Sequence, residues 1–124
     1  MNNPRNAYLA SMVTTASPAR LLVLLYDRLL RDLQQAAELQ DAGAHLEAAP
    51  HLLHAQEIVL ELHSSLQVDV WEGAERLSAI YTFLHRELVR ANVKCDVEVT
   101  RSCHALVEPL ADAWRQAALA GAEA

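Results

Sequence analysis

The hydrophobic residues of this chain recur at alternating intervals of three and four, which is the spacing of one face of an α-helix. Four stretches follow this spacing, and no stretch of useful length shows the period of two that a half-buried β-strand requires. The pattern therefore predicts four helices. The stripe positions are Leu22, Tyr26, Leu29, Leu33 and Ala36; Leu52 or Leu53, Ala55, Ile58 or Val59, Leu62 and Leu66; Leu77, Ile80 or Tyr81, Leu84, Leu88 and Ala91; and Val99, Cys103, Leu106, Leu110, Ala113 or Trp114 and Ala117.

Residues that begin and end helices mark the first two stretches. Pro18 suits the first position of a helix, where its missing N–H removes no hydrogen bond. The first helix is expected to span about residues 18–40 and to end at Gly43, which readily adopts the left-handed conformation of a helix stop. The second helix is expected to begin between residues 44 and 49, because Pro50 is best tolerated in a first turn.

The third and fourth stretches are separated by a tight connection. Residues 67–72 are expected to form a loop, followed by a third helix from residue 73 or 74 to 91. Asp96 is a predicted N-cap for the fourth helix. Pro109 lies inside that helix and removes one backbone hydrogen bond. We expect a kink there rather than two separate helices, because the apolar stripe keeps its phase across the proline.

Four helices with short connections predict an all-α fold, an antiparallel up-down four-helix bundle with an N-terminal strap segment. Residues 1–16 are assigned to the strap, residues 17–120 to the bundle as a single domain, and residues 121–124 to a frayed tail. A chain of 124 residues is long enough to bury a core of this kind.

Composition and charge argue against two classes of partner, nucleic acids and membranes. The 16 acidic residues outnumber the 10 lysines and arginines, for a net charge of −6, and no basic stripe is present to neutralise phosphates. Nucleic-acid binding is therefore not expected. The longest apolar run, residues 21–26, is too short to cross a bilayer, so membrane insertion is not expected either. Two cysteines without metal-binding spacing, and no apolar signal segment, favour a reducing, cytoplasmic location.

Several polar residues on one predicted helix are of types that can bind a metal ion. His51, His54, Glu57 and Glu61 lie on one predicted helix, but a metal site in a bundle core needs a Glu-x-x-His pair from each of two helices. Neither pair is present, so no metal and no cofactor is expected.

A histidine phosphotransfer module is the alternative function, because such modules are also small four-helix bundles. His85, followed by the positive Arg86, is the nearest candidate for the phosphorylated residue. No glycine follows to make room for a phosphate. A phosphotransfer role therefore stays open as the rival to the function considered below.

Enzyme activity is not expected. Cys103 and His104 are neighbours in sequence, so their side chains diverge by about 100° on a helix and do not form a thiolate–imidazole pair. Cys103 is instead expected to be a small core residue. Asp27 and Asp112 are expected to be ordinary surface carboxylates, and no nucleophile elbow or phosphate-binding loop is present.

The first helix carries more apolar residues than one stripe can use. Leu21, Val23, Leu24, Leu25 and Leu30 fall partly outside it. A helix that is apolar on more than one side must be covered on more than one side. Some of this cover is expected to come from another protein, either a client or a second copy of the chain in a homodimer.

Five short motifs, in order along the chain, resemble the FliS family of flagellin-specific export chaperones. The resemblance covers roughly residues 8–116, and its value lies in the order and spacing of the motifs. The motifs are Tyr8 with Thr15-Ala16-Ser17-Pro18 and Leu25-Tyr26-Asp27; residues 54–62; residues 77–81; Ala91-Asn92 with Asp96; and Ala111-Asp112-Ala113-Trp114.

The resemblance implies a function. Members of this family bind the disordered C-terminal segment of flagellin in the cytosol, prevent its premature polymerisation and present it to the flagellar type III export gate. The family fold is an antiparallel four-helix bundle, and the client wraps around it, partly as helices in apolar grooves. The N-terminal segment of such proteins lies over part of this surface and moves aside.

The candidate client-binding residues come from the strap and from three of the predicted helices. Core and groove positions share the same helical spacing, so the helical candidates are open to either role. The candidates are Tyr8, Leu9, Met12 and Val13 in the strap, and Ile58, Leu62, Ile80, Leu84 and Leu106 in the bundle.

Overall fold

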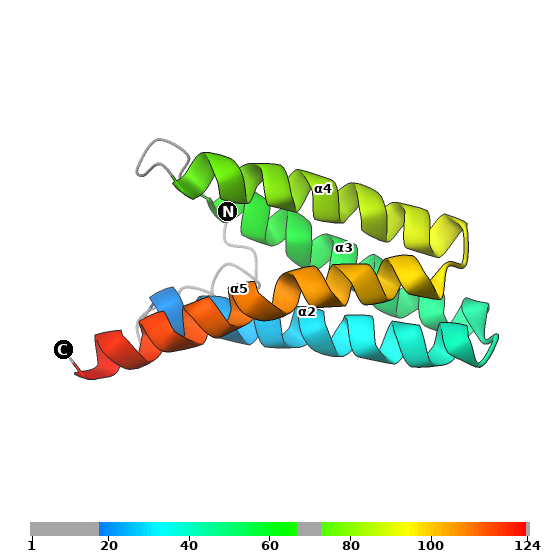
Figure 1. The fold of residues 1–124 in the computed structure, drawn as a ribbon, viewed down its shortest axis with the longest axis horizontal. Helices are drawn as coiled ribbons and strands as arrows, with labels where there is room; N and C mark the ends of the chain where they lie inside the picture. Colours follow the sequence, from blue (N-terminus) through cyan, green and yellow to red (C-terminus); the bar gives the residue numbers. More distant parts are fainter. Residues whose placement is uncertain (1–17, 67–72, 124) are drawn as a thin grey trace, which may run out of the picture.

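The computed structural model describes residues 18–66 and 73–123, and these residues form four helices (Figure 1). The helices are α2 (Pro18–Asp41), α3 (His45–Ser65), α4 (Gly73–Val93) and α5 (Val97–Glu123). Two predictions lie outside the described residues: the strap candidates Tyr8, Leu9, Met12 and Val13, and the loop predicted at residues 67–72.

The four helices form the predicted bundle. Each helix packs against two others, in the cyclic order α2, α3, α4, α5, and α5 returns to pack on α2. Figure 1 shows that α4 and α5 lie close together where the chain passes between them and diverge toward the beginning of α4. The prediction of an all-α four-helix bundle is confirmed.

The end of α2 follows the prediction closely. Gly43 has a φ of 78° and donates its N–H to the Gln40 carbonyl at 3.0 Å. Ala44 donates its N–H to the Leu39 carbonyl at 2.8 Å. This pair of bonds is a Schellman motif, which satisfies carbonyls that the helix end would otherwise leave unpaired.

The end of α4 uses the same motif with a different residue. Cys95 has a φ of 52° and donates its N–H to the Asn92 carbonyl at 3.3 Å. Asp96 donates its N–H to the Ala91 carbonyl at 3.0 Å. Cys95 therefore occupies the left-handed position that glycine takes at the end of α2, and its Cβ makes this conformation unfavourable.

Asp96 then caps α5, as the sequence predicted. Its Oδ1 accepts hydrogen bonds from the backbone N–H of Glu98 at 3.0 Å and of Val99 at 3.4 Å. These two N–H groups belong to the first turn of α5 and have no partner within the helix.

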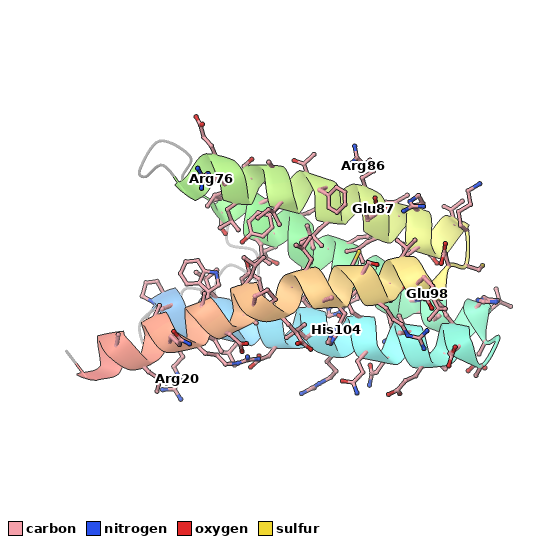
Figure 2. The ribbon with its side chains drawn as sticks, in the orientation of Figure 1. Arg20, Arg76, Arg86, Glu87, Glu98 and His104 are labelled. Carbon is pink, nitrogen blue, oxygen red and sulfur yellow. The ribbon has the colours of Figure 1, made fainter. Side chains whose placement is uncertain are left out.

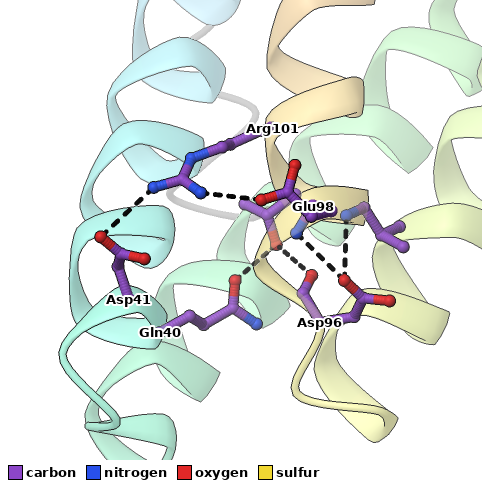
Figure 3. A network of polar contacts seen from close by, with 7 residues as sticks. Gln40, Asp41, Asp96, Glu98 and Arg101 are labelled. Carbon is purple, nitrogen blue, oxygen red and sulfur yellow. Dashed lines mark hydrogen bonds and ion pairs between the residues drawn. The ribbon is translucent and has the colours of Figure 1, made fainter.

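A buried amide joins this turn to α2 (Figure 3). The Gln40 amide donates to the Ala91 carbonyl at 3.1 Å, and its oxygen accepts a hydrogen bond from the Thr100 hydroxyl at 2.6 Å. At the surface beside it, Arg101 of α5 reaches Asp41 of α2 at 3.4 Å. The end of α2, the end of α4 and the start of α5 are thus held together by satisfied polar groups.

Pro50 does not lie in the first turn of its helix, so the prediction for its position was wrong. The second helix begins at His45, within the expected interval, and Pro50 is its sixth residue. Pro50 has no N–H to donate to the carbonyl of Leu46. Leu46 is almost fully exposed, so water can serve this carbonyl. The buried neighbours Ala48 and Leu52 show that packing holds the helix through the proline.

The last helix is longer than expected. It runs through Pro109 as one helix rather than two, as predicted, and Pro109 itself is exposed. The kink expected at Pro109 stays a prediction. It then continues to Glu123, through residues that the sequence analysis assigned to a frayed tail.

Two tyrosines link opposite helices through the core. The hydroxyls of Tyr26 in α2 and Tyr81 in α4 lie 2.6 Å apart, and both side chains are buried. Burial raises the pKa of both phenols, so both stay protonated. The His63 ring lies 5.9 Å from the Tyr81 ring and hydrogen-bonds the Ser78 hydroxyl at 2.8 Å.

The left-handed Cys95 gives a stability prediction. Cys95→Gly removes the Cβ from this unfavourable conformation and is expected to raise the free energy of unfolding by about 1 kcal/mol. Urea unfolding followed by circular dichroism measures it. Cys95→Ala removes the thiol but keeps the Cβ, and serves as the control with no comparable gain. Equal stabilities for the glycine and alanine variants would show that the turn carries no such strain.

Pro109 gives a second prediction. Pro109→Ala restores one backbone donor in an exposed part of α5 and is expected to raise the free energy of unfolding by about 3 kcal/mol. Gln116→Ala, an exposed substitution in the same helix, is the control. A change no larger than that of the control would mean that the native packing fully accommodates the proline.

Candidate partner-binding surface

A groove of about 300 Å³ lies between α4 and α5. Its apolar part is formed by Val99 and Cys103, which are buried, and by Phe83, which is exposed. A polar rim surrounds this apolar floor. The complete lining is Phe83, Glu87 and Arg90 from α4 and Glu98, Val99, Ser102 and Cys103 from α5.

The rim of the groove carries paired charges. Arg90 Nε lies 2.7 Å from Glu87 Oε2, and this hydrogen bond raises the pKa of the arginine. The guanidinium of Arg86 lies 5.5 Å from the centre of the Phe83 ring, a distance compatible with a cation–π contact. Figure 2 shows Glu87 on α4 and Glu98 on α5 at the end of the bundle where these helices approach each other.

Cys103 contributes its packing rather than its reactivity. The side chain is buried, as expected of a small core residue, and burial raises the pKa of its thiol to about 11. The thiol is therefore protonated at neutral pH and is a poor nucleophile. The neighbouring His104 turns away and pairs with Glu108 at 3.3 Å.

Two of the sequence candidates, Ile80 and Leu106, lie close in sequence to residues that line this groove but are not among them. Ile80 lies three residues before Phe83 on α4, and Leu106 lies three residues after Cys103 on α5, so each shares a helix face with a lining residue. Both side chains are partly buried against the core.

The other three helical candidates are placed in the core. Ile58, Leu62 and Leu84 are all buried and belong to the same cluster of packed side chains. All three side chains pack inside this core cluster, and none of them lines the groove. A partner would reach them only after the helices separated.

Apolar packing is what joins α4 to α5. Among the described residues, no hydrogen bond or ion pair links a side chain of α4 directly to one of α5. By contrast, α5 is tied to α2 by Arg115, which contacts Asp27 at 2.6 Å while also holding Asp112 at 2.5 Å. These two carboxylates, expected to be simply solvated, therefore share one guanidinium, which raises the pKa of Arg115.

A second groove, of about 490 Å³, lies between α2 and α5. Polar and charged side chains dominate it, including the Arg101–Asp41 pair and His104, which Figure 2 labels where α5 lies beside α2. Its lining is Leu33, Gln34, Ala37, Glu38 and Asp41 from α2 and Arg101, His104 and Glu108 from α5. Nothing in the sequence pattern distinguished these residues from an ordinary solvated face.

Exposed apolar side chains occur on all four helices, whereas the sequence pattern predicted a surplus on the first helix. Of the surplus residues in the first helix, Leu24 is exposed, whereas Leu21, Val23, Leu25 and Leu30 are partly buried. Most of the exposed set lies on other helices. Within residues 18–66 and 73–123, the large apolar side chains that are exposed are Leu24, Leu46, Leu53, Leu60, Phe83, Val89, Val93 and Leu119.

The histidines of α3 take part in a polar contact with α2. His54 Nδ1 hydrogen-bonds Asp32, and His54 Nε2 lies 3.2 Å from the Arg28 guanidinium. Arginine only donates, so Nε2 accepts and Nδ1 carries the proton given to Asp32. His51 Nδ1 lies 3.7 Å from the same carboxylate. Over the residues 18–66 and 73–123, no group of three or more metal-binding side chains is positioned to hold an ion.

The four described helices are 21 to 27 residues long, so their apolar character decides whether one could cross a membrane. None of them combines the length and the apolar character that a bilayer crossing requires.

Comparison with known proteins gives a consistent result. The family model described as "Flagellar protein FliS" matches residues 1–121. The flagellar secretion chaperone FliS of Bacillus subtilis is 32% identical over 117 residues, which cover 94% of this chain and 87% of the relative. The protein of the same name from Escherichia coli is 28% identical over 114 residues, covering 88% of this chain and 82% of the relative.

A solved structure supports the fold. A crystal structure described as a flagellar chaperone from bacteria superposes with a TM-score of 0.75 at 18% identity, covering 93% of this chain and 97% of the other. Together with the match over almost the whole length, these observations show that the chain belongs to the FliS family of flagellar secretion chaperones, a family of chaperones and not of enzymes.

Proposed function

We propose that this protein binds the disordered C-terminal segment of flagellin in the cytoplasm, prevents its premature polymerisation and delivers it to the flagellar type III export apparatus. Membership of the FliS family supports this proposal. The observation that carries it is the groove between α4 and α5 with its apolar floor. Ile80 and Leu106, which are partly buried against the core on the same two helices, are proposed to extend its walls.

The groove suits an amphipathic helix. Such a helix binds by laying its apolar face into an apolar channel while its polar face stays in water. Phe83 and Val99 offer the apolar contact, and the Glu87–Arg90 pair and Glu98 offer polar contacts at the rim. A client that polymerises through its own apolar helix face is shielded while that face is occupied.

The weak connection between α4 and α5 suits a client that folds as it binds. Segments of this kind bury about 1,000–3,000 Å² on binding and lose part of the gain to their own ordering. Since the described residues show only apolar side-chain contacts joining α4 directly to α5, a small widening of the groove breaks none of the polar side-chain bonds seen there. Ile80 and Leu106 then gain contact area without disruption of the core.

The N-terminal residues complete the proposed site. Tyr8, Leu9, Met12 and Val13 lie outside the described residues and are included among the proposed client-binding residues on the family resemblance. Ile58, Leu62 and Leu84 support the groove from within the core. A component of the export gate then receives the loaded complex.

The alternative of a phosphotransfer module is not favoured. The family match covers nearly the whole chain and points to a chaperone. The Arg86 side chain beside His85 is engaged with the Phe83 ring.

Client binding is tested by titration. The C-terminal segment of flagellin from the same organism is added to the protein and followed by calorimetry and circular dichroism. We expect a Kd below 1 µM, equivalent to about −8 kcal/mol or better. The peptide is expected to gain helix, with a negative heat-capacity change from apolar burial. Absence of binding by this authentic segment would refute the proposal.

The groove itself is tested by Phe83→Glu. Loss of an apolar contact worth about 1.5–3 kcal/mol is expected to weaken client binding tenfold or more. Val89→Glu is the matched control, because Val89 lies on the same helix with 38% exposure against 43% for Phe83, six residues away and outside the groove lining. If both substitutions weakened binding equally, the client would not use this groove.

A further inference from the structure

The outer face of α3 carries a straight row of exposed leucines. Leu46, Leu53 and Leu60 are exposed by 92%, 51% and 50%. They are spaced seven residues apart, which places them in one line along about 21 Å of helix. Burial of three leucines in such a line is the usual way in which one helix recognises another.

This row faces away from the bundle. Leu62, nine residues after Leu53, lies on the opposite side of α3 and is buried in the core. The helix packs on α2 and α4 but not on α5, so the row is separate from the groove between α4 and α5. The α3 sequence therefore has two apolar faces, and the bundle uses one of them.

The charge beside the row selects its partner. Helix α3 contains no lysine or arginine, and its glutamates include the exposed Glu47 and Glu57. Glu57 lies four residues after Leu53 and three before Leu60, directly beside the row. Pro50 lies between Leu46 and Leu53 and leaves the Leu46 carbonyl free of its usual helical donor.

A second copy of the chain is a poor occupant of this face. Two copies of α3 in antiparallel contact would bring the same flank of each helix together, and this flank carries Glu57. Like charges facing each other across an interface are unfavourable. A helix with lysine or arginine beside its apolar residues would instead pair with Glu47 and Glu57 and supply donors near Leu46.

We propose that the row of Leu46, Leu53 and Leu60 is a second docking surface, which binds an amphipathic helix of another protein with aliphatic residues at heptad spacing and a basic flank. This surface operates independently of the groove between α4 and α5 and leaves that groove open to its own occupant.

The test uses two synthetic helical peptides with leucines at heptad spacing, one flanked by lysines and one by glutamates. Anisotropy titration of the lysine peptide into the full chain is expected to give saturable binding that weakens with salt. The glutamate peptide is expected to bind at least tenfold more weakly. Equal binding of the two peptides, or no saturable binding of the lysine peptide, would overturn the proposal.

Variants locate the site. Leu53→Gln is expected to weaken binding of the lysine peptide at least tenfold, and so is Leu46→Gln, whose nearly full exposure keeps the fold intact. Phe83→Glu is the control on the other groove and is expected to leave this binding unchanged. Loss of binding with Phe83→Glu but not with the leucine variants would overturn the assignment.

Two further outcomes decide the occupant. Sedimentation of the free protein is expected to give a monomer, and a dimer that Leu53→Gln dissociates would assign the row to a second copy instead. The flagellin C-terminal segment is expected not to displace the lysine peptide. Displacement would make the row part of the client site and overturn its independence, while the proposed function would stand.

Discussion

The buried amide of Gln40 holds together one end of the bundle, where α2 and α4 end and α5 begins. It donates to the carbonyl of Ala91 at the end of α4 and accepts from the hydroxyl of Thr100 at the start of α5. A buried amide left without these partners would cost about 1–3 kcal/mol, so the three helix ends are held in one arrangement. With Asp96 capping α5 beside it, the separation of α4 and α5 is set here.

The polar links farther along the bundle hold each of these helices to α2. The hydroxyls of Tyr26 and Tyr81 join α4 to α2, and Arg115 joins α5 to α2 through Asp27. Apolar packing then has to hold α4 against α5 over the rest of their length. The groove follows from this distribution of bonds, since it lies between the two adjacent helices that share no direct polar side-chain contact within the described residues.

Local chemistry explains why the fold was predictable from the sequence. The glycine at the end of α2 and the cap at Asp96 act within one turn, and the heptad-like stripes select one buried face per helix. The prediction placed Pro50 in a first turn, but α3 continues on both sides of it. The free energy lost with one backbone hydrogen bond in an exposed stretch is outweighed by the burial of Ala48 and Leu52 around it. Local preference is a weaker determinant than tertiary packing in such cases.

The site was only partly predictable, for a geometric reason. Ile80 and Leu106 have the same helical spacing as Leu84, yet the first two are only partly buried against the core, whereas Leu84 is buried within it. The difference depends on how the helices are rotated in the bundle. Phe83 was missed because it lies off the apolar stripe, where an exposed aromatic next to an arginine was the available signal.

Client binding in the groove between α4 and α5 is tested most directly by mapping the methyl signals of the chaperone by NMR while the flagellin segment is added. We predict that the largest changes in methyl signals occur at Ile80, Val99 and Leu106, and that the signals of Val89 and Leu46 stay nearly unaffected. Changes concentrated on the outer face of α3, or none along the walls between α4 and α5, would contradict this prediction.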